Sequence, residues 1–208
     1  MIKVFFLIFE TELTWDRIVA AKRSVINVFL LHLLPMLLIT CAIEGAGLRQ
    51  WGRIHPDIRR VIPLTRGDVL LFEVFQFGLS LIIVFVCSHL VRMLGRTFRR
   101  KTTYQDAFTV VAYGLSPMFL LRVADAFPGI SPWATWGVGI LLSIWILYQG
   151  LPRVMNPDPT HAFGLYLTSS MILILVTGLF RVLTVLYLMQ HIRHIAAHFK
   201  TYFPSLHF

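Results

Sequence analysis

Charged residues are scarce in this sequence. Of 208 residues, 14% are charged and 57% are hydrophobic, whereas soluble domains hold about 25% charged and about 45–50% apolar residues. The mean hydropathy is correspondingly high, at +0.73. The composition therefore excludes an ordinary soluble domain and predicts an integral membrane protein.

The sequence also has few cysteines and lacks the common catalytic motifs. The two cysteines, Cys41 and Cys87, lie far apart in apolar segments, which is too sparse for a disulfide framework or a cysteine metal site. The sequence has no glycine-rich phosphate loop, no His-Glu-x-x-His motif and no nucleophile elbow. A haem would need two histidines facing each other at similar depth, and the candidates His32 and His89 fall at different depths. We therefore expect no enzymatic activity and no cofactor.

The apolar residues that are present gather in five long blocks. A helix needs roughly 20 residues to cross the hydrocarbon of a bilayer, and each block has about this length. We expect spans over residues 26–47, 69–94, 107–127, 133–151 and 163–190. The predicted fold class is all-α, a polytopic membrane bundle of five transmembrane helices whose termini lie on opposite sides of the membrane.

An amphipathic segment, residues 1–25, precedes the predicted five-helix domain of residues 26–190. Trp15, Ile18 and Val19 recur at helical spacing, so we expect an interfacial helix that runs into the first span, with Trp15 at headgroup depth. The apolar run at the start ends at a glutamate before any cleavage site. We expect it to be retained and not removed as a signal peptide.

The last predicted segment, residues 191–208, is a His-rich amphipathic tail. His191, His194 and His198 share one helical face, but no fixed fourth ligand accompanies them. We favour an interfacial helix over a metal site.

Basic residues are concentrated in the connections between the spans. The formal net charge is +9, and the positive residues occur on both sides of the predicted bundle, which suits lipid headgroups better than nucleic acid. The dense RTFRRK after the second span favours an amino terminus inside the cell, which is the orientation we expect, although the five arginines of the first loop favour the opposite.

Five of the charged side chains inside the predicted spans form a candidate intramembrane polar network. Arg122 and Asp125 are three residues apart, so they share a helix face and can neutralise each other. Arg181 lies deepest, and we expect it to pair with Glu44, Glu73 or Asp125, because an unpaired charge at this depth costs about 2.5–3.5 kcal/mol. We favour structural pairs; the alternative is a polar path for a substrate or an ion.

Two sequence features predict how the helices bend and pack. Pro117 lacks the amide hydrogen that would bond the carbonyl of Tyr113, so we expect a kink in the third span. Gly139 and Ser143 place small residues on one face of the fourth span, which allows another helix to approach closely.

Several short motifs resemble the Yip family of small integral membrane proteins. They are Ala112 and Tyr113 with Pro117 in the third span, the break at Pro128, the group Tyr148, Gly150, Leu151 and Pro152 that closes the fourth span, and TWDRI before the first. The resemblance covers most of residues 14–190. It implies a five-helix bundle, and the short amino terminus is similar to that of bacterial members, so the interaction of eukaryotic members with Ypt/Rab GTPases is not carried over.

Two functions remain open from the sequence. The first is a non-enzymatic protein of a bacterial inner membrane that binds lipids, a membrane-protein partner or further copies of itself. The second is a small-solute or ion transporter or channel that uses the intramembrane charged residues.

Overall fold

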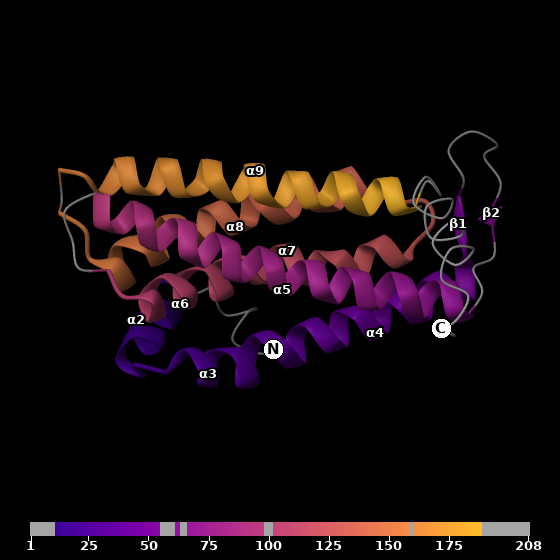
Figure 1. The fold of residues 1–208 in the computed structure, drawn as a ribbon, viewed down its shortest axis with the longest axis horizontal. Helices are drawn as coiled ribbons and strands as arrows, with labels where there is room; N and C mark the ends of the chain where they lie inside the picture. The colour runs from indigo at the N-terminus through magenta and orange to yellow at the C-terminus, as the bar shows by residue number, and fades with distance from the viewer. Residues whose placement is uncertain (1–10, 55–60, 63–65, 98–101, 159, 189–208) are drawn as a thin grey trace, which may run out of the picture.

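The protein is a bundle of five long helical spans that lie side by side (Figure 1). The computed structural model describes residues 11–54, 61–62, 66–97, 102–158 and 160–188. Each span is long and apolar enough to cross a membrane. The predicted all-α bundle of five transmembrane helices is confirmed, and the chain is a multi-pass integral membrane protein.

The spans follow the predicted order. The first comprises α3 (Val25–Val28), a π-helical turn (Phe29–Leu33) and α4 (Leu34–Trp51). The second is α5 (Arg66–Thr97). The third comprises α6 (Tyr104–Gly114), α7 (Ser116–Leu121) and a 3-10 turn (Arg122–Ala126). The fourth is α8 (Pro132–Met155) and the fifth is α9 (Ala162–Leu188).

The third span occupies the centre of the bundle. Its most apolar stretch is 78% buried, compared with 33–44% for the other spans. α6 packs on α5 and α8, and α7 packs on α8. The large side chains Phe108, Tyr113 and Phe119 of this span are fully buried. Since the outer spans face lipid on much of their surface, the third span supplies most of the contacts that hold the bundle together.

Small residues allow α8 to lie close to α7. A Cβ added to Gly139 would lie 2.8 Å from the Cα of Met118, which is too close for two carbon atoms that are not bonded. Ser143, one turn further along α8, is completely buried. The predicted small-residue face of the fourth span is therefore confirmed.

The third span breaks at the proline that the sequence singled out. α6 ends at Gly114, and Pro117 lies in the first turn of α7, where a missing amide hydrogen leaves no bond unmade. The hydroxyl of Ser116 donates to the carbonyl of Ala112 across this break, at 2.9 Å. The same hydroxyl lies 2.9 Å from Nε2 of His32, which belongs to the π-helical turn of the first span. The break is thus packed against a second irregular turn.

The amino-terminal helix α2 (Thr11–Ala20) packs on α8. Trp15 is fully buried, and its indole Nε1 donates to the carbonyl of Ile146 at 3.2 Å. Trp15 therefore has a protein neighbour, and its predicted place at headgroup depth stays a prediction, because burial against α8 does not fix depth in a bilayer. The prediction that the helix runs into the first span is wrong, because the helix ends at Ala20 and Ser24 caps α3 separately.

The first loop contains a short strand pair that the sequence analysis did not predict. β1 (Arg53–Ile54) pairs antiparallel with β2 (Val61–Ile62). Figure 1 shows these strands at one end of the bundle and α2 and α3 at the other. Residues 1–10 and the tail 191–208, with its three histidines, lie outside the described residues, so the interpretation of the tail stays a prediction.

Candidate functional site

All five charged residues singled out in the spans lie near the strand end of the bundle, and we call them the charged cluster. Glu44 comes from α4, Glu73 from α5, Arg122 and Asp125 from the 3-10 turn, and Arg181 from α9. Each is buried, with exposed fractions of 1%, 9%, 7%, 3% and 6% respectively. The cluster therefore joins the first, second, third and fifth spans through side chains that are withdrawn from lipid.

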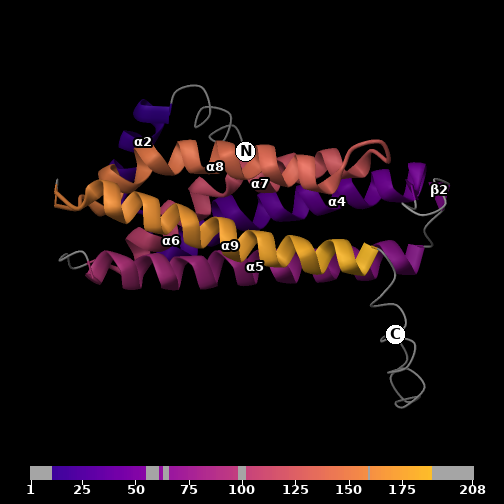
Figure 2. The same cartoon turned by 90° about the horizontal axis from the view of Figure 1, so that it is seen from above.

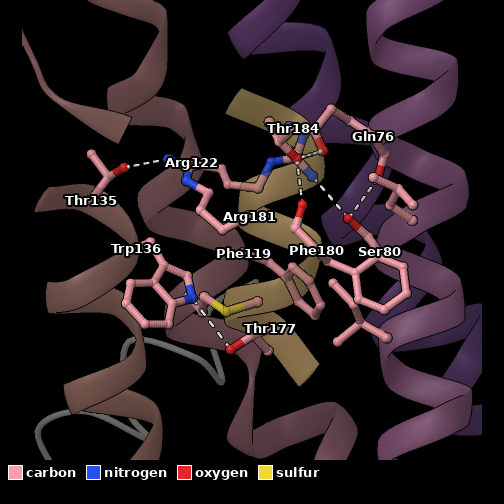
Figure 3. Close-up of a pocket in the computed structure, with 13 residues that line it drawn as sticks. Gln76, Ser80, Phe119, Arg122, Thr135, Trp136, Thr177, Phe180, Arg181 and Thr184 are labelled. Carbon is pink, nitrogen blue, oxygen red and sulfur yellow. Dashed lines mark hydrogen bonds between the residues drawn. The ribbon is translucent and has the colours of Figure 1, made fainter. Parts of the chain in front are cut away.

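Arg122 is bound to the first and second spans. Its Nη2 donates to Oε2 of Glu44 at 2.6 Å, and its Nε donates to the same oxygen at 3.1 Å. Its Nη1 donates to the hydroxyl of Ser80 on α5 at 2.9 Å (Figure 3). Because charge-assisted hydrogen bonds in a dry interior are strong, this guanidinium fixes the distance between α4, α5 and the third span.

Arg181 is bound to the third and fourth spans. Its Nη2 donates to Oδ2 of Asp125 at 2.6 Å and to the hydroxyl of Thr135 at 2.8 Å. Its Nε donates to the carbonyl of Pro132 at 2.9 Å, in the first turn of α8. The hydroxyl of Thr135 in turn donates to Asp125. The pairing of Arg181 with Asp125, one of three partners considered from the sequence, draws α9 to the break between the third and fourth spans.

The predicted local pair between Arg122 and Asp125 missed the main partners of both residues. The two side chains sit in a 3-10 turn and not in an α-helix. Their shortest ion pairs run to other spans, from Arg122 to Glu44 and from Asp125 to Arg181. Sequence spacing alone favoured the local pair, because contacts between spans leave no periodic signal in the sequence.

Glu73 is the least compensated member of the charged cluster. Its Oε2 lies 3.7 Å from Nη2 of Arg122, which already binds Glu44. Neither carboxyl oxygen has a hydrogen-bond partner within the described residues. A Cβ on Gly45 would lie 3.0 Å from Cγ of Glu73, so the glycine of α4 makes the room for this side chain. The cluster holds three carboxyl groups and two guanidinium groups, and Glu73 is the one in excess.

A small cavity lies between the two arginine contacts. It has a volume of about 40 Å³, which is room for a few waters at roughly 10–15 Å³ each. Arg122, Arg181, Gln76 and Thr184 are among its polar lining, and the hydroxyl of Thr184 donates to the side-chain oxygen of Gln76 at 3.0 Å (Figure 3). The sequence analysis missed Ser80, Thr135 and Thr184, because neutral hydroxyls are common in membrane helices and carry no distinctive spacing.

A second, larger hollow lies at the opposite end of the bundle, on the outer surface. This interfacial groove has a volume of about 400 Å³. Its lining comes from α2, the end of α8 and the start of α9: Glu12, Tyr148, Gln149, Pro152, Arg153, Ala162, Phe163 and Tyr166. Of these, Tyr148 and Pro152 belong to the sequence motif that closes the fourth span. The structure thus places a polar cluster inside the bundle and an amphipathic groove outside it.

Comparison with known proteins agrees with this architecture. No curated protein and no solved structure was found to match the chain. A family model described as the Yip1 domain matches residues 6–180, which include α2, the first four spans and most of α9. The match covers more than half of the sequence, and it confirms the resemblance drawn from the motifs of the third and fourth spans. The chain belongs to the Yip1 family of membrane proteins.

Proposed function

We propose that this protein is a non-enzymatic membrane protein of a bacterial inner membrane, and that it acts by binding lipid or a partner membrane protein at its outer surface. The observation that carries the proposal is the difference between its two hollows. The cavity inside the bundle measures about 40 Å³, whereas the interfacial groove measures about 400 Å³. Of these two hollows, the groove is the one with room for a ligand larger than a few waters.

The charged cluster has a structural role in this proposal. The guanidinium groups of Arg122 and Arg181 each donate hydrogen bonds to neighbouring spans. Removing one partner of a buried ion pair strongly destabilises a protein, even where the intact pair adds little net stability. The cluster therefore specifies how the spans are arranged and leaves ligand recognition to the surface.

Native mass spectrometry of the full chain, extracted gently from its own membrane, tests the proposal. We expect a stoichiometric lipid, a protein companion or a second copy to remain bound. A bare monomer that retains neither, together with flux of a solute in liposomes, would overturn it.

Transport is the second candidate, and Glu73 is the observation that favours it. Glu73 is buried within a span and has no hydrogen-bond partner among the described residues, and ionisable groups placed in this way are typical of ion and proton pathways. Liposome flux measured on the wild type, Glu73→Gln and Arg181→Ala decides between the two candidates. Transport requires flux in the wild type that the folded Glu73→Gln variant loses. We expect no flux that depends on either residue.

A further inference from the structure

The interfacial groove combines an aromatic wall with a polar floor. Tyr148 of α8 and Tyr166 of α9 meet edge to face with ring centroids 5.1 Å apart, and Phe163 lies 6.4 Å from Tyr166. Tyr148 and Phe163 are exposed by 52% and 69%. Arg153, Gln149 and Glu12 supply the polar lining. One face of the groove is therefore suited to hydrocarbon or glycerol and the other to a charged group.

The groove lies at the depth where the headgroups of a bilayer are found. α8 ends at Met155 and α9 begins at Ala162, so every lining residue of these helices is within about two turns of a span end. Tyrosine is enriched at this depth because its ring is apolar and its hydroxyl is polar. Figure 2 shows α2 lying against α8 at this end of the bundle. A ligand of the groove is consequently a component of the membrane interface.

The polar floor carries an excess of acceptors. Arg153 is close to two carboxylates, with Nη2 3.3 Å from Oε2 of Glu12 and Nε 3.4 Å from Oδ1 of Asp16. Its Nη1 donates to the main-chain carbonyl of Gln149 at 3.1 Å. Two carboxylates and one guanidinium leave one negative charge in excess.

A ligand that complements these groups needs a hydrogen-bonding cation beside an anion. We propose that the interfacial groove binds the headgroup of an aminophospholipid, with its primary ammonium at the carboxylate of Glu12 and its phosphate at Arg153. The glycerol and the first acyl carbons lie along Tyr148, Phe163 and Tyr166. This inference rests on the proposed function and names the ligand class of its outer surface.

Other common phospholipids fit these groups less well. A quaternary ammonium carries the charge but has no hydrogen to donate, so it makes no charge-assisted hydrogen bond with the carboxylate of Glu12. A glycerol headgroup brings a phosphate without a cation and adds negative charge beside Glu12 and Asp16. The arrangement therefore selects for a primary ammonium and not only for a phospholipid.

The test uses the full chain in nanodiscs that contain equal amounts of phosphatidylethanolamine, phosphatidylcholine and phosphatidylglycerol. Native mass spectrometry after release from the nanodisc reports which lipid stays bound. We expect the ethanolamine lipid to be enriched about fivefold over its share of the bilayer, the effect of roughly one charge pair at a membrane surface. Glu12→Gln and Arg153→Gln should each remove most of this enrichment.

A matched control comes from the same end of the bundle. Asp158 is exposed and is not part of the groove lining, so Asp158→Asn removes the same charge and should leave the enrichment unchanged. Thermal unfolding of each variant confirms that it is folded before lipids are counted. Enrichment of the glycerol lipid, enrichment of none, or ethanolamine enrichment that survives both groove variants would each overturn the inference. Retention of a protein partner without lipid selectivity overturns this inference and leaves the proposed function standing.

Discussion

Replacing Arg122 with glutamine should destabilise the bundle more than almost any other single change in the spans. Arg122 is 7% exposed and Glu44 is 1% exposed. The substitution removes two charged hydrogen bonds to one oxygen of Glu44 and one bond to Ser80. It leaves Glu44 buried without its ion-pair partner. Breaking a buried pair in this way costs about 3–5 kcal/mol.

The double variant Arg122→Gln/Glu44→Gln separates the pair from its surroundings. With both charges gone, no uncompensated charge remains between the two positions, and the loss should fall to about 1–2 kcal/mol, the cost of imperfectly paired amides. The double variant should therefore be about 2–3 kcal/mol more stable than Arg122→Gln alone, because removing the second charge relieves the cost left by removing the first. Arg96→Gln, at an exposed position of α5, is the control and should change stability by less than about 0.5 kcal/mol.

Reversible unfolding of the purified protein in mixed detergent micelles, followed by circular dichroism, gives these free energies. A double variant as unstable as Arg122→Gln alone would show that Glu44 is not the group left without compensation. A loss below about 1 kcal/mol in Arg122→Gln would refute the role of the charged cluster in holding the spans together.

Three further substitutions test other parts of the structure by the same unfolding assay. Glu73→Gln should not lower stability, because the carboxyl has no hydrogen-bond partner in the described residues and is the acid in excess; a loss above about 1 kcal/mol would show an unrecognised partner. Gly150→Ala should cost about 1–3 kcal/mol, since its Cβ would overlap the ring of Trp15 and push α2 off α8, whereas Gly137→Ala, whose Cβ meets nothing within 4 Å, should be neutral or slightly stabilising. Thr103→Ala should cost about 0.5–2 kcal/mol, because Thr103 and Asp106 form a capping box at the start of α6; an unchanged midpoint would mean that packing alone holds this helix end.

The spans themselves could be predicted from the sequence because the bilayer sets both their length and their composition. The break at Pro117 could be predicted too, since a missing amide hydrogen acts locally. The partners of Arg122 and Asp125 could not. A 3-10 turn rotates successive side chains by a different angle from an α-helix, and the neighbours of the turn depend on how five helices pack.

The environment of Trp15 illustrates the same limit for the amphipathic helix. The spacing of Trp15 and Ile18 predicted correctly which face of α2 is apolar, and both side chains are buried. It could not tell whether that face meets lipid or protein, because both are apolar. The distinguishing feature is Gly150, whose missing side chain makes room for the indole ring. That contact joins residues far apart in the sequence and has no periodic signal.

The charged cluster and the interfacial groove lie at opposite ends of the bundle, so their effects should be separable. Glu44, Glu73 and Arg181 are each about seven residues, or about 10 Å, from the ends of their helices on the strand side. The groove lies at the other ends of α8 and α9. Sites this far apart with no shared partners usually act additively. A folded Arg181→Lys variant should therefore lose stability and still select the same lipid, measured by the two assays on one sample. A change in lipid selectivity without loss of stability would show that the two ends are coupled through the central third span.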